Sequence, residues 1–345
     1  MRLNTLLPAA FVAITALFVS PAAFAQAAPA LQGTTLTVAY QDPAFPALVE
    51  KSGVLNGSPY KVDWVLLTGP AANLSALYAG RVDLGHMGDT SLTIEQANAR
   101  TEWTTETIPL RIIAGWRNAY SKDFPPLITA VRSDTKITSP QQIKGHKFGY
   151  NYGGYNHAQY LATLVQAGLK EKDIEPIKFN DGATSAAAFN SGQVEVYAGS
   201  LAPVLNTIRS GAGRILLTDR DTTIPALGVW TATASVLKDP VKTAALQDFF
   251  ERLSGYWPWH DAHREDVLAV LKDKLKISDE RASFEYKLRS GNFIAFTPEL
   301  IAQEQKIADI LYDGNAIRKQ VNVAVEYDPR FNQAQKAVWP VPAEP

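Results

Sequence analysis

The stretch KGHKFGYNYGGYNHAQY, Lys144–Tyr160, combines residue types that could bind an anion. It predicts a strand over His146–Tyr150, a sharp turn at Gly153 and Gly154, and a helix that opens near Tyr155–His157. The start of such a helix presents unpaired backbone N–H groups and the positive end of its dipole, which favour a bound anion. An ordinary strand-to-helix connection is the alternative interpretation of the glycine pair. The polar and aromatic side chains that crowd this helix start favour the binding interpretation.

The first 25 residues are expected to be a secretory signal peptide and not part of the fold. Arg2 precedes an apolar stretch, and Ala23-Phe24-Ala25 forms an A-x-A-like cleavage site. Cleavage after Ala25 would leave 345 − 25 = 320 residues, enough for two domains, in an exported, periplasmic protein. The chain has no cysteine, so it has no disulfide, no thiol nucleophile and no lipid-carrying cysteine after the signal. A formal net charge of −1 provides no basic surface for nucleic acid.

Strand, turn and helix alternate along the first part of the mature chain. Strands are predicted at Thr34–Tyr40, Lys61–Leu67, Arg81–His86 and Leu110–Trp116, with helices between them. This alternation predicts an α/β fold with a mostly parallel sheet flanked by helices. Ligands of such sheets bind beyond the carboxyl ends of the strands. The loops at that edge are Gln41–Pro43, Thr68–Pro70 and Gly88–Thr90.

A polar, proline-bearing passage, Arg117–Pro126, is interpreted as a crossing into a second lobe. Strands follow at 127–131, 146–150, 174–179, 195–197 and 214–218, again alternating with helices. A weak internal sequence similarity, or echo, between residues 65–85 and 177–197 indicates two related halves. In this alignment Asn180–Gly182 is equivalent to Thr68–Pro70. The strand Gly228–Thr233 would return the chain to the first lobe. The predicted organisation is residues 32–118 and 230–325 for lobe 1, 119–229 for lobe 2, and 326–345 for an irregular tail.

The remainder is predicted to be almost wholly helical, from Pro240 to Tyr312. Tyr256-Trp257-Pro258-Trp259 is expected to seal a core, although a ligand-binding role is the alternative. His260 and His263 lack further ligands at matched spacing, so we expect a solvated face and no metal site.

Several motifs together resemble the substrate-binding proteins of ABC transporters of the aliphatic sulfonate, taurine and nitrate type. They are GPAANLSALYAGRVDLGHMGD, ITSPQQIKGHKFGYNYGGYNHAQYLATLVQAGL, DGATSAAAFNSGQVEVYA and PELIAQEQKIADILYDGNAIRKQVNV. The resemblance covers about Thr34 to Val323. It implies a two-lobed type II periplasmic binding protein fold that clamps one small organic anion, an alkyl or aryl sulfonate. It also implies delivery to an inner-membrane permease and ATPase, by a carrier that we expect to be monomeric and without a cofactor.

The same resemblance maps the sulfonate-gripping loop onto Gly153–His157 and cleft-lining positions onto the Gly69 turn and Gly88–Thr90. The chain departs from the family at 199–203, where Gly-Ser-Leu-Ala-Pro stands in place of a Trp, an acidic residue and Pro. The missing carboxylate puts taurine in doubt. The expected ligand-binding residues are Gln41, Thr68, Gly69, Gly88, Asp89, Thr90, Trp116, Tyr152, Gly154, Tyr155, Asn156, His157, Ser200 and Trp230.

Two kinds of enzyme are similar to these binding proteins, desulfinases and thiamine-pyrimidine synthases. The desulfinase type rests on a cysteine nucleophile, which this chain lacks. No Ser-His-Asp or paired-carboxylate arrangement is legible, so no catalytic residue is assigned. The residues therefore favour a binding protein. Its ligand could be an alkyl or aryl sulfonate, a sulfate ester or a carboxylate, because a helix start recognises the charge and oxygen geometry of the anion and not its tail.

Overall fold

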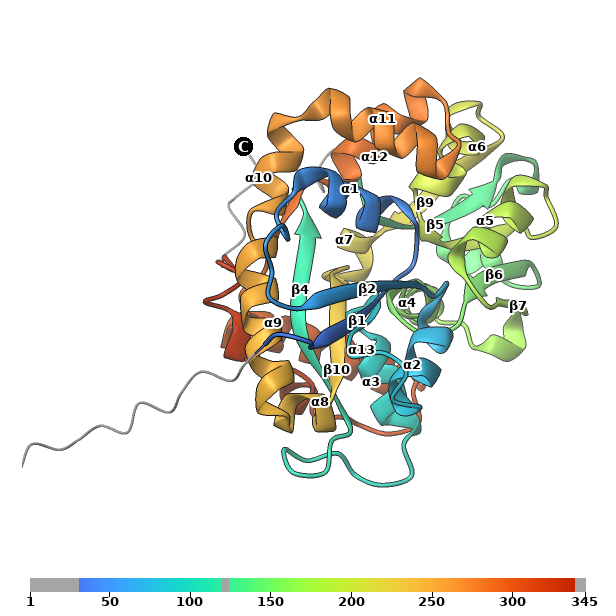
Figure 1. Ribbon diagram of the computed structural model, residues 1–345. Helices are drawn as coiled ribbons and strands as arrows, with labels where there is room; N and C mark the ends of the chain where they lie inside the picture. Colours follow the sequence, from blue (N-terminus) through green and yellow to red (C-terminus); the bar gives the residue numbers. More distant parts are fainter. Residues whose placement is uncertain (1–30, 120–123, 339–345) are drawn as a thin grey trace, which may run out of the picture.

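The fold consists of two α/β lobes that lie side by side (Figure 1). The structure is a computed structural model and describes residues 31–119 and 124–338. The predicted signal peptide and its cleavage site therefore lie outside the described residues. The first lobe holds a two-stranded sheet, β1-β2, and a four-stranded sheet, β11-β4-β10-β3. The second lobe holds one five-stranded sheet, β7-β6-β8-β5-β9.

The strands largely follow the predicted runs. The clearest shift is in the third strand, which was expected at Arg81–His86 but spans Gly85–Gly88. Residues 81–84 precede the strand, and of these Leu84 makes only an isolated bridge to Val38 of β1. The strands are β1 Thr35–Tyr40, β2 Lys61–Leu66, β3 Gly85–Gly88, β4 Leu110–Asn118, β5 Leu127–Arg132, β6 Lys147–Asn151, β7 Glu175–Phe179, β8 Val196–Ser200, β9 Gly213–Thr218, β10 Gly228–Thr233 and β11 Gly291–Phe293.

Strand directions are mixed in both lobes, whereas the sequence suggested mostly parallel sheets. Strand β6 runs parallel to β7 and β8, and β1 runs parallel to β2. Strand β5 is antiparallel to β8 and β9, and β10 is antiparallel to β3 and β4. A parallel pair needs a crossover connection, usually a helix. Strands β5 and β10 instead follow segments that cross between the lobes, and they enter their sheets in the opposite direction.

The helices pack against the faces of these sheets (Figure 1), as the alternating pattern predicts. Two adjacent strands, β4 and β10, lead into and out of the second lobe. The helices are α1 Ala44–Ser52, α2 Pro70–Tyr78, α3 Ser91–Asn98, α4 Tyr155–Ala167, α5 Gly182–Asn190, α6 Leu205–Arg209, α7 Asp219–Thr222, α8 Ala234–Lys238, α9 Pro240–Leu253, α10 Tyr256–Ala262, α11 Arg264–Leu275, α12 Asp279–Arg289 and α13 Pro298–Asp313.

The segment after α13 packs into the first lobe as far as it is described. Tyr327 bridges to Ile112 of β4, Phe331 is buried in the core, and the side-chain amide of Gln335 donates to the carbonyl of Ile113 over 2.8 Å. Irregular backbone can be buried in this way because its polar groups find partners.

Helix α10 seals the core of the first lobe, as the aromatic run predicts. Tyr256 and Trp257 are buried there. His260, however, is fully buried and stacks on Tyr286 at 4.7 Å between ring centroids, whereas a solvated face was expected. His263 is exposed as expected. The prediction for His260 was wrong because α12, which supplies Tyr286, covers that face of α10.

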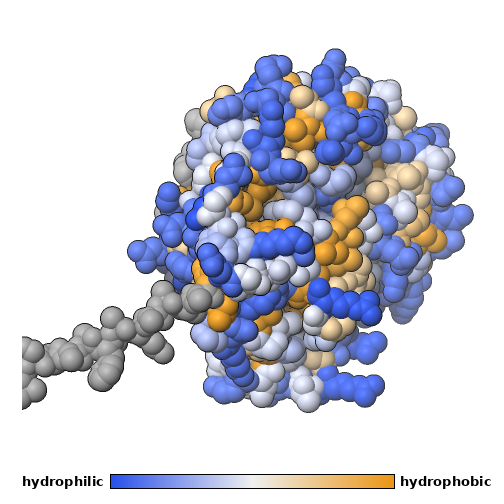
Figure 2. All heavy atoms as spheres, in the orientation of Figure 1, coloured by the Kyte–Doolittle hydropathy of each residue, from blue (hydrophilic) through white to orange (hydrophobic). Residues whose placement is uncertain are grey.

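Polar and charged side chains cover much of the face shown in Figure 2, with smaller apolar patches between them. No helix within residues 31–119 and 124–338 is both long and apolar enough to cross a bilayer.

Candidate functional site

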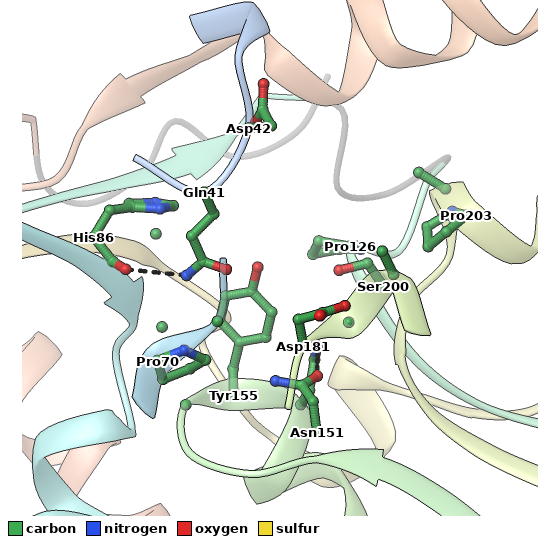
Figure 3. Close-up of a pocket in the computed structure, with 18 of the residues that line it drawn as sticks. Gln41, Asp42, Pro70, His86, Pro126, Asn151, Tyr155, Asp181, Ser200 and Pro203 are labelled. Carbon is green, nitrogen blue, oxygen red and sulfur yellow. Dashed lines mark hydrogen bonds between the residues drawn. The ribbon is translucent and has the colours of Figure 1, made fainter. Parts of the chain in front are cut away.

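A cavity of about 410 Å³ lies between the two lobes (Figure 3). Both lobes line it. The first lobe contributes the loop after β1, the start of α2, the end of β3 and one face of α12. The second lobe contributes the starts of α4 and α5 and the end of β8. Of the residues expected at the site, those that line this cavity are Gln41, Thr68, Gly69, Gly88, Trp116, Gly154, Tyr155, Asn156 and Ser200.

Three helices begin at this cavity. Helix α4 follows Gly154, which has a φ of 73°, and α2 follows Gly69, which has a φ of 81°. These left-handed conformations favour glycine, and they let the chain turn abruptly from strand to helix. Helix α5 begins after Asp181, whose carboxylate accepts the N–H of Thr184 over 2.8 Å. First-turn N–H groups have no acceptor within their own helix, and no side chain caps α2 or α4, so these two starts turn donors and positive dipole ends toward the cavity, whereas Asp181 caps α5.

The side chains beside the start of α4 are held in place by neighbouring polar groups. The amide of Asn156 donates to the side-chain oxygen of Asn151 over 2.6 Å, and both residues are nearly buried. Gly182, at the start of α5, lies next to this pair: a Cβ there would be in ordinary contact with the Asn156 side-chain nitrogen, at 3.4 Å. The start of α4 and the start of α5 therefore lie next to each other in the lining of the cavity.

The phenol ring of Tyr155 stands in the middle of the cavity, next to Gln41 (Figure 3). Burial raises the pKa of Tyr155, although a hydrogen bond with Ser200 opposes this shift. Gln41 is fixed by its side-chain amide, which donates to the carbonyl of His86 over 3.0 Å. Polar groups of both lobes therefore reach the centre of the cavity.

Aromatic rings form the wall of the first lobe. Tyr40 stacks on His86 at 4.2 Å, and His86 stacks on Trp116 at 5.1 Å. Burial lowers the pKa of His86 to about 3, so this imidazole is neutral at physiological pH. The wall thus offers apolar and π surface to a ligand and no cationic imidazole.

Charged side chains of α12 line the end of the cavity near Asp42. Glu285 accepts from Arg281 over 2.7 Å and from Arg289 over 3.2 Å. Arg289 also pairs with Asp42 over 3.2 Å. The sequence analysis missed Arg281, Glu285 and Arg289, although their spacing of four places them on one helix face, because nothing in the sequence shows which face meets the cavity.

The sequence model of the NMT1/THI5-like family matches residues 61–246, which is more than half of the chain. The chain belongs to this NMT1/THI5-like family. It is 25% identical over 296 residues to a protein of Escherichia coli (strain K12) whose assigned name is aliphatic sulfonates-binding protein, covering 84% of this chain and 86% of that protein. The resemblance drawn from the motifs is confirmed.

Two groups of solved structures show the same fold as this NMT1/THI5-like chain. The alkanesulfonate-binding protein SsuA from Xanthomonas axonopodis pv. citri, bound to MOPS, superimposes with a TM-score of 0.72 at 19% identity, over 86% of this chain and 99% of that one. The desulfurization enzyme DSZB superimposes with a TM-score of 0.56 at 15% identity, over 88% of this chain and 99% of that one. These likenesses confirm the two-lobed α/β fold.

Asp89 and Thr90 were expected to contact the ligand but lie buried behind the cavity in this NMT1/THI5-like chain. The Asp89 carboxylate accepts the N–H of Leu227 over 2.7 Å and that of Thr90 over 2.8 Å. Burial raises the pKa of Asp89 to about 6. Because Leu227 precedes β10, Asp89 ties the end of β3 to the segment that returns from the second lobe.

Tyr152, His157 and Trp230 also lie outside the main cavity. Tyr152 and His157 line a separate cavity of about 250 Å³ with Lys178. The His157 ring accepts the N–H of Gly153 over 3.4 Å, and burial lowers its pKa to about 4. Trp230 is fully buried in the first lobe and donates to the carbonyl of Ala39 over 3.1 Å. His157 thus supports the glycine turn from behind.

Proposed function

We propose that this chain is the periplasmic solute-binding component of an ABC importer and that its ligand is a small organic anion, an alkyl or aryl sulfonate. The observation that carries the proposal is the convergence of the starts of α2, α4 and α5 on one cavity between the lobes. Backbone N–H groups at helix starts bind oxyanions without needing a cationic side chain. The assigned name of the Escherichia coli relative supports a sulfonate in particular.

The contacts between the lobes support a clamp that closes over the ligand. Gly88 of the first lobe packs so closely on Tyr155 that a Cβ at Gly88 would lie 2.7 Å from the Tyr155 nitrogen. Gly69 packs equally closely on the backbone of Asn180. These contacts describe a closed arrangement, and hinge motion about the crossings beside β4 and β10 would admit and release the ligand.

We infer that the ligand is bound without chemical change. The chain has no cysteine, so a thiolate nucleophile of the desulfinase type is impossible. Within the described ranges, no cluster of three or more His, Asp or Glu side chains could hold a metal ion. The protein would be exported, act as a monomer, and deliver its ligand to an inner-membrane permease and ATPase.

A thermal-shift screen tests this proposal. The mature chain is heated with ethanesulfonate, butanesulfonate, benzenesulfonate, butyl sulfate and butyrate, with butylammonium as the control of opposite charge. A sulfonate at 100 times its dissociation constant should stabilise the protein by about 2.7 kcal/mol, and butylammonium should not. The ligand should be recovered unchanged. The proposal fails if no sulfonate raises the melting temperature, or if the sulfonate is consumed.

A further inference from the structure

Helix α12 bridges the two lobes, although it belongs in sequence to the first. Its Phe284 is buried against the core of the second lobe and meets Phe124 edge-to-face at 4.9 Å. On another face, Ala282 is buried in the core of the first lobe. In this closed arrangement, a helix held from both sides presents its third face to the cavity in a fixed position.

That third face carries three charged groups, which form with Asp42 of the loop after β1 a row of four that neutralise one another. Arg281 and Arg289 both donate to Glu285, and Arg289 donates to Asp42 as well. Two guanidinium groups and two carboxylates leave no net formal charge. Glu285 is only 7% exposed, so these pairs are partly withdrawn from water.

Each arginine has donors to spare. The bonds of Arg281 use Nε and Nη2, and those of Arg289 use Nε and Nη1. Nη1 of Arg281 and Nη2 of Arg289 have no partner among the residues that the structure describes. A guanidinium group carries five N–H donors in a fixed plane, so the row has N–H groups left for another acceptor.

The end of the row at Arg289 and Asp42 lies away from the starts of α2, α4 and α5. Asp42, the partner of Arg289, is at one end of the cavity in Figure 3, and Pro70 and Asn151 are at the other, with Tyr155 and Gln41 between them. A ligand whose anionic group sits at the helix starts would therefore extend its tail past Tyr155 toward α12.

We propose that Arg281 and Arg289 form a second subsite, which binds a neutral hydrogen-bond acceptor on the ligand tail: a hydroxyl, ether or carbonyl oxygen. This inference rests on the proposed function, because it places the sulfonate at the helix starts. An acceptor without full charge suits the row because its own charges already cancel. The subsite selects sulfonates with an oxygen-bearing tail over plain alkanesulfonates of equal length.

Calorimetry with matched ligand pairs tests the subsite. Each pair has the same number of heavy atoms and differs only at the tail: butanesulfonate against 3-hydroxypropanesulfonate, and pentanesulfonate against 4-hydroxybutanesulfonate. At one chain length or more, the hydroxyl ligand should bind about tenfold tighter, as expected for a hydrogen bond to a charged donor. The Arg281→Met variant should lose this advantage, read as the ratio of the two affinities, because both ligands of a pair carry the same charge and the lost guanidinium affects their sulfonate groups equally.

Lys287→Met provides the matched control, because Lys287 lies on the same helix but stacks on Phe124, away from the cavity. It should retain the tenfold advantage. Glu285→Gln provides a second variant. It removes the carboxylate that pairs with both arginines, so the affinity for 3-sulfopropanoate should be about tenfold higher than in the parent protein.

Four outcomes are decisive. Equal affinity for hydroxyl and methyl ligands at every length overturns the subsite, and so does an advantage that persists in a folded Arg281→Met protein. If Arg281→Met does not fold, unchanged 3-sulfopropanoate affinity in Glu285→Gln overturns it. If no sulfonate binds at all, the proposed function fails instead, so the two failures are distinguishable.

Discussion

At the scale of single residues, the site depends on glycines that allow close approach between the lobes. Gly88 ends β3 and touches the backbone of Tyr155, and Gly154 lies beside Pro70 and Ser91 of the first lobe. Gly154 also requires a positive φ, whereas the conformation of Gly88 is open to other residues. Gly88 is therefore needed for space and Gly154 for both space and conformation.

Replacing Gly88 by Ala should weaken ligand binding without unfolding the protein. The added Cβ would overlap the Tyr155 ring and lie 2.7 Å from its nitrogen, so the lobes could not close fully. We expect affinity for the best sulfonate of the screen to fall at least tenfold, measured by calorimetry. X-ray scattering should show a smaller decrease in the radius of gyration on adding ligand.

Gly255→Ala is the control for this variant, because a Cβ at Gly255 would meet its neighbours only at ordinary contact distances of 3.4 Å or more. It should bind as the parent does. A Gly88→Ala protein with parental affinity and parental closure would show that the contact between β3 and α4 is not part of the clamp.

The chemistry of individual side chains was harder to predict than their positions. His157 and Asp89 were expected to face the ligand, but each bonds a backbone N–H and lies buried behind the cavity. A residue beside a glycine turn can point to either side of it, and sequence alone does not show which. The pKa of His157, lowered to about 4 by burial, also excludes it as a cation for the ligand at neutral pH.

At the scale of elements, the strand, glycine turn and helix at 146–167 were predictable, because the turn and the helical spacing are local features. The structure has β6 at Lys147–Asn151 and α4 at Tyr155–Ala167. The mirrored turns at Thr68–Pro70 and Asn180–Gly182 were also predictable from the internal echo, and they meet at the close approach of Gly69 to Asn180. Short-range pattern thus locates the parts of the site that are built from helix starts.

Helix α12 shows what such reasoning could not reach. Its apolar positions predict a helix, but its contacts come from Phe124 on one side and from His260 on the other. These partners are far from α12 in sequence, as are Asp42 and the cavity. The charged end of the site, formed by α12 and Asp42, therefore could not be predicted from the sequence, because it depends on how the two lobes pack together.

At the scale of the whole molecule, buried carboxyl groups near the crossings make stability depend on pH. Asp219 of α7 is buried, and burial raises its pKa from 3.8 to about 6, partly offset by Arg117. Between pH 4 and pH 6 the folded protein therefore holds a proton that the unfolded chain has released. The contribution of Asp219 to stability is full below about pH 4 and declines as the pH rises through 6.

The Asp219→Asn variant should gain stability relative to the parent as the pH rises from 4 to 7. The difference in the free energy of unfolding should shift by up to about 3 kcal/mol in favour of the variant, since each pKa unit is worth about 1.4 kcal/mol. Denaturant unfolding at each pH measures it. A difference that stays constant between pH 4 and pH 7 would contradict a raised pKa at Asp219.

The central claim is that a sulfonate is held between the lobes by the start of α4. Titration calorimetry of the best sulfonate of the screen against Asn156→Asp and Gly154→Pro tests it most directly. Asn156→Asp keeps the side-chain shape but adds a negative charge beside the helix start, and Gly154→Pro cannot adopt the φ of 73° that the turn requires.

Asn315→Asp, the same chemical change at an exposed position outside the cleft, serves as the control. The account predicts that both site variants lose at least tenfold in affinity while the control binds normally. Parental affinity in both site variants would contradict it.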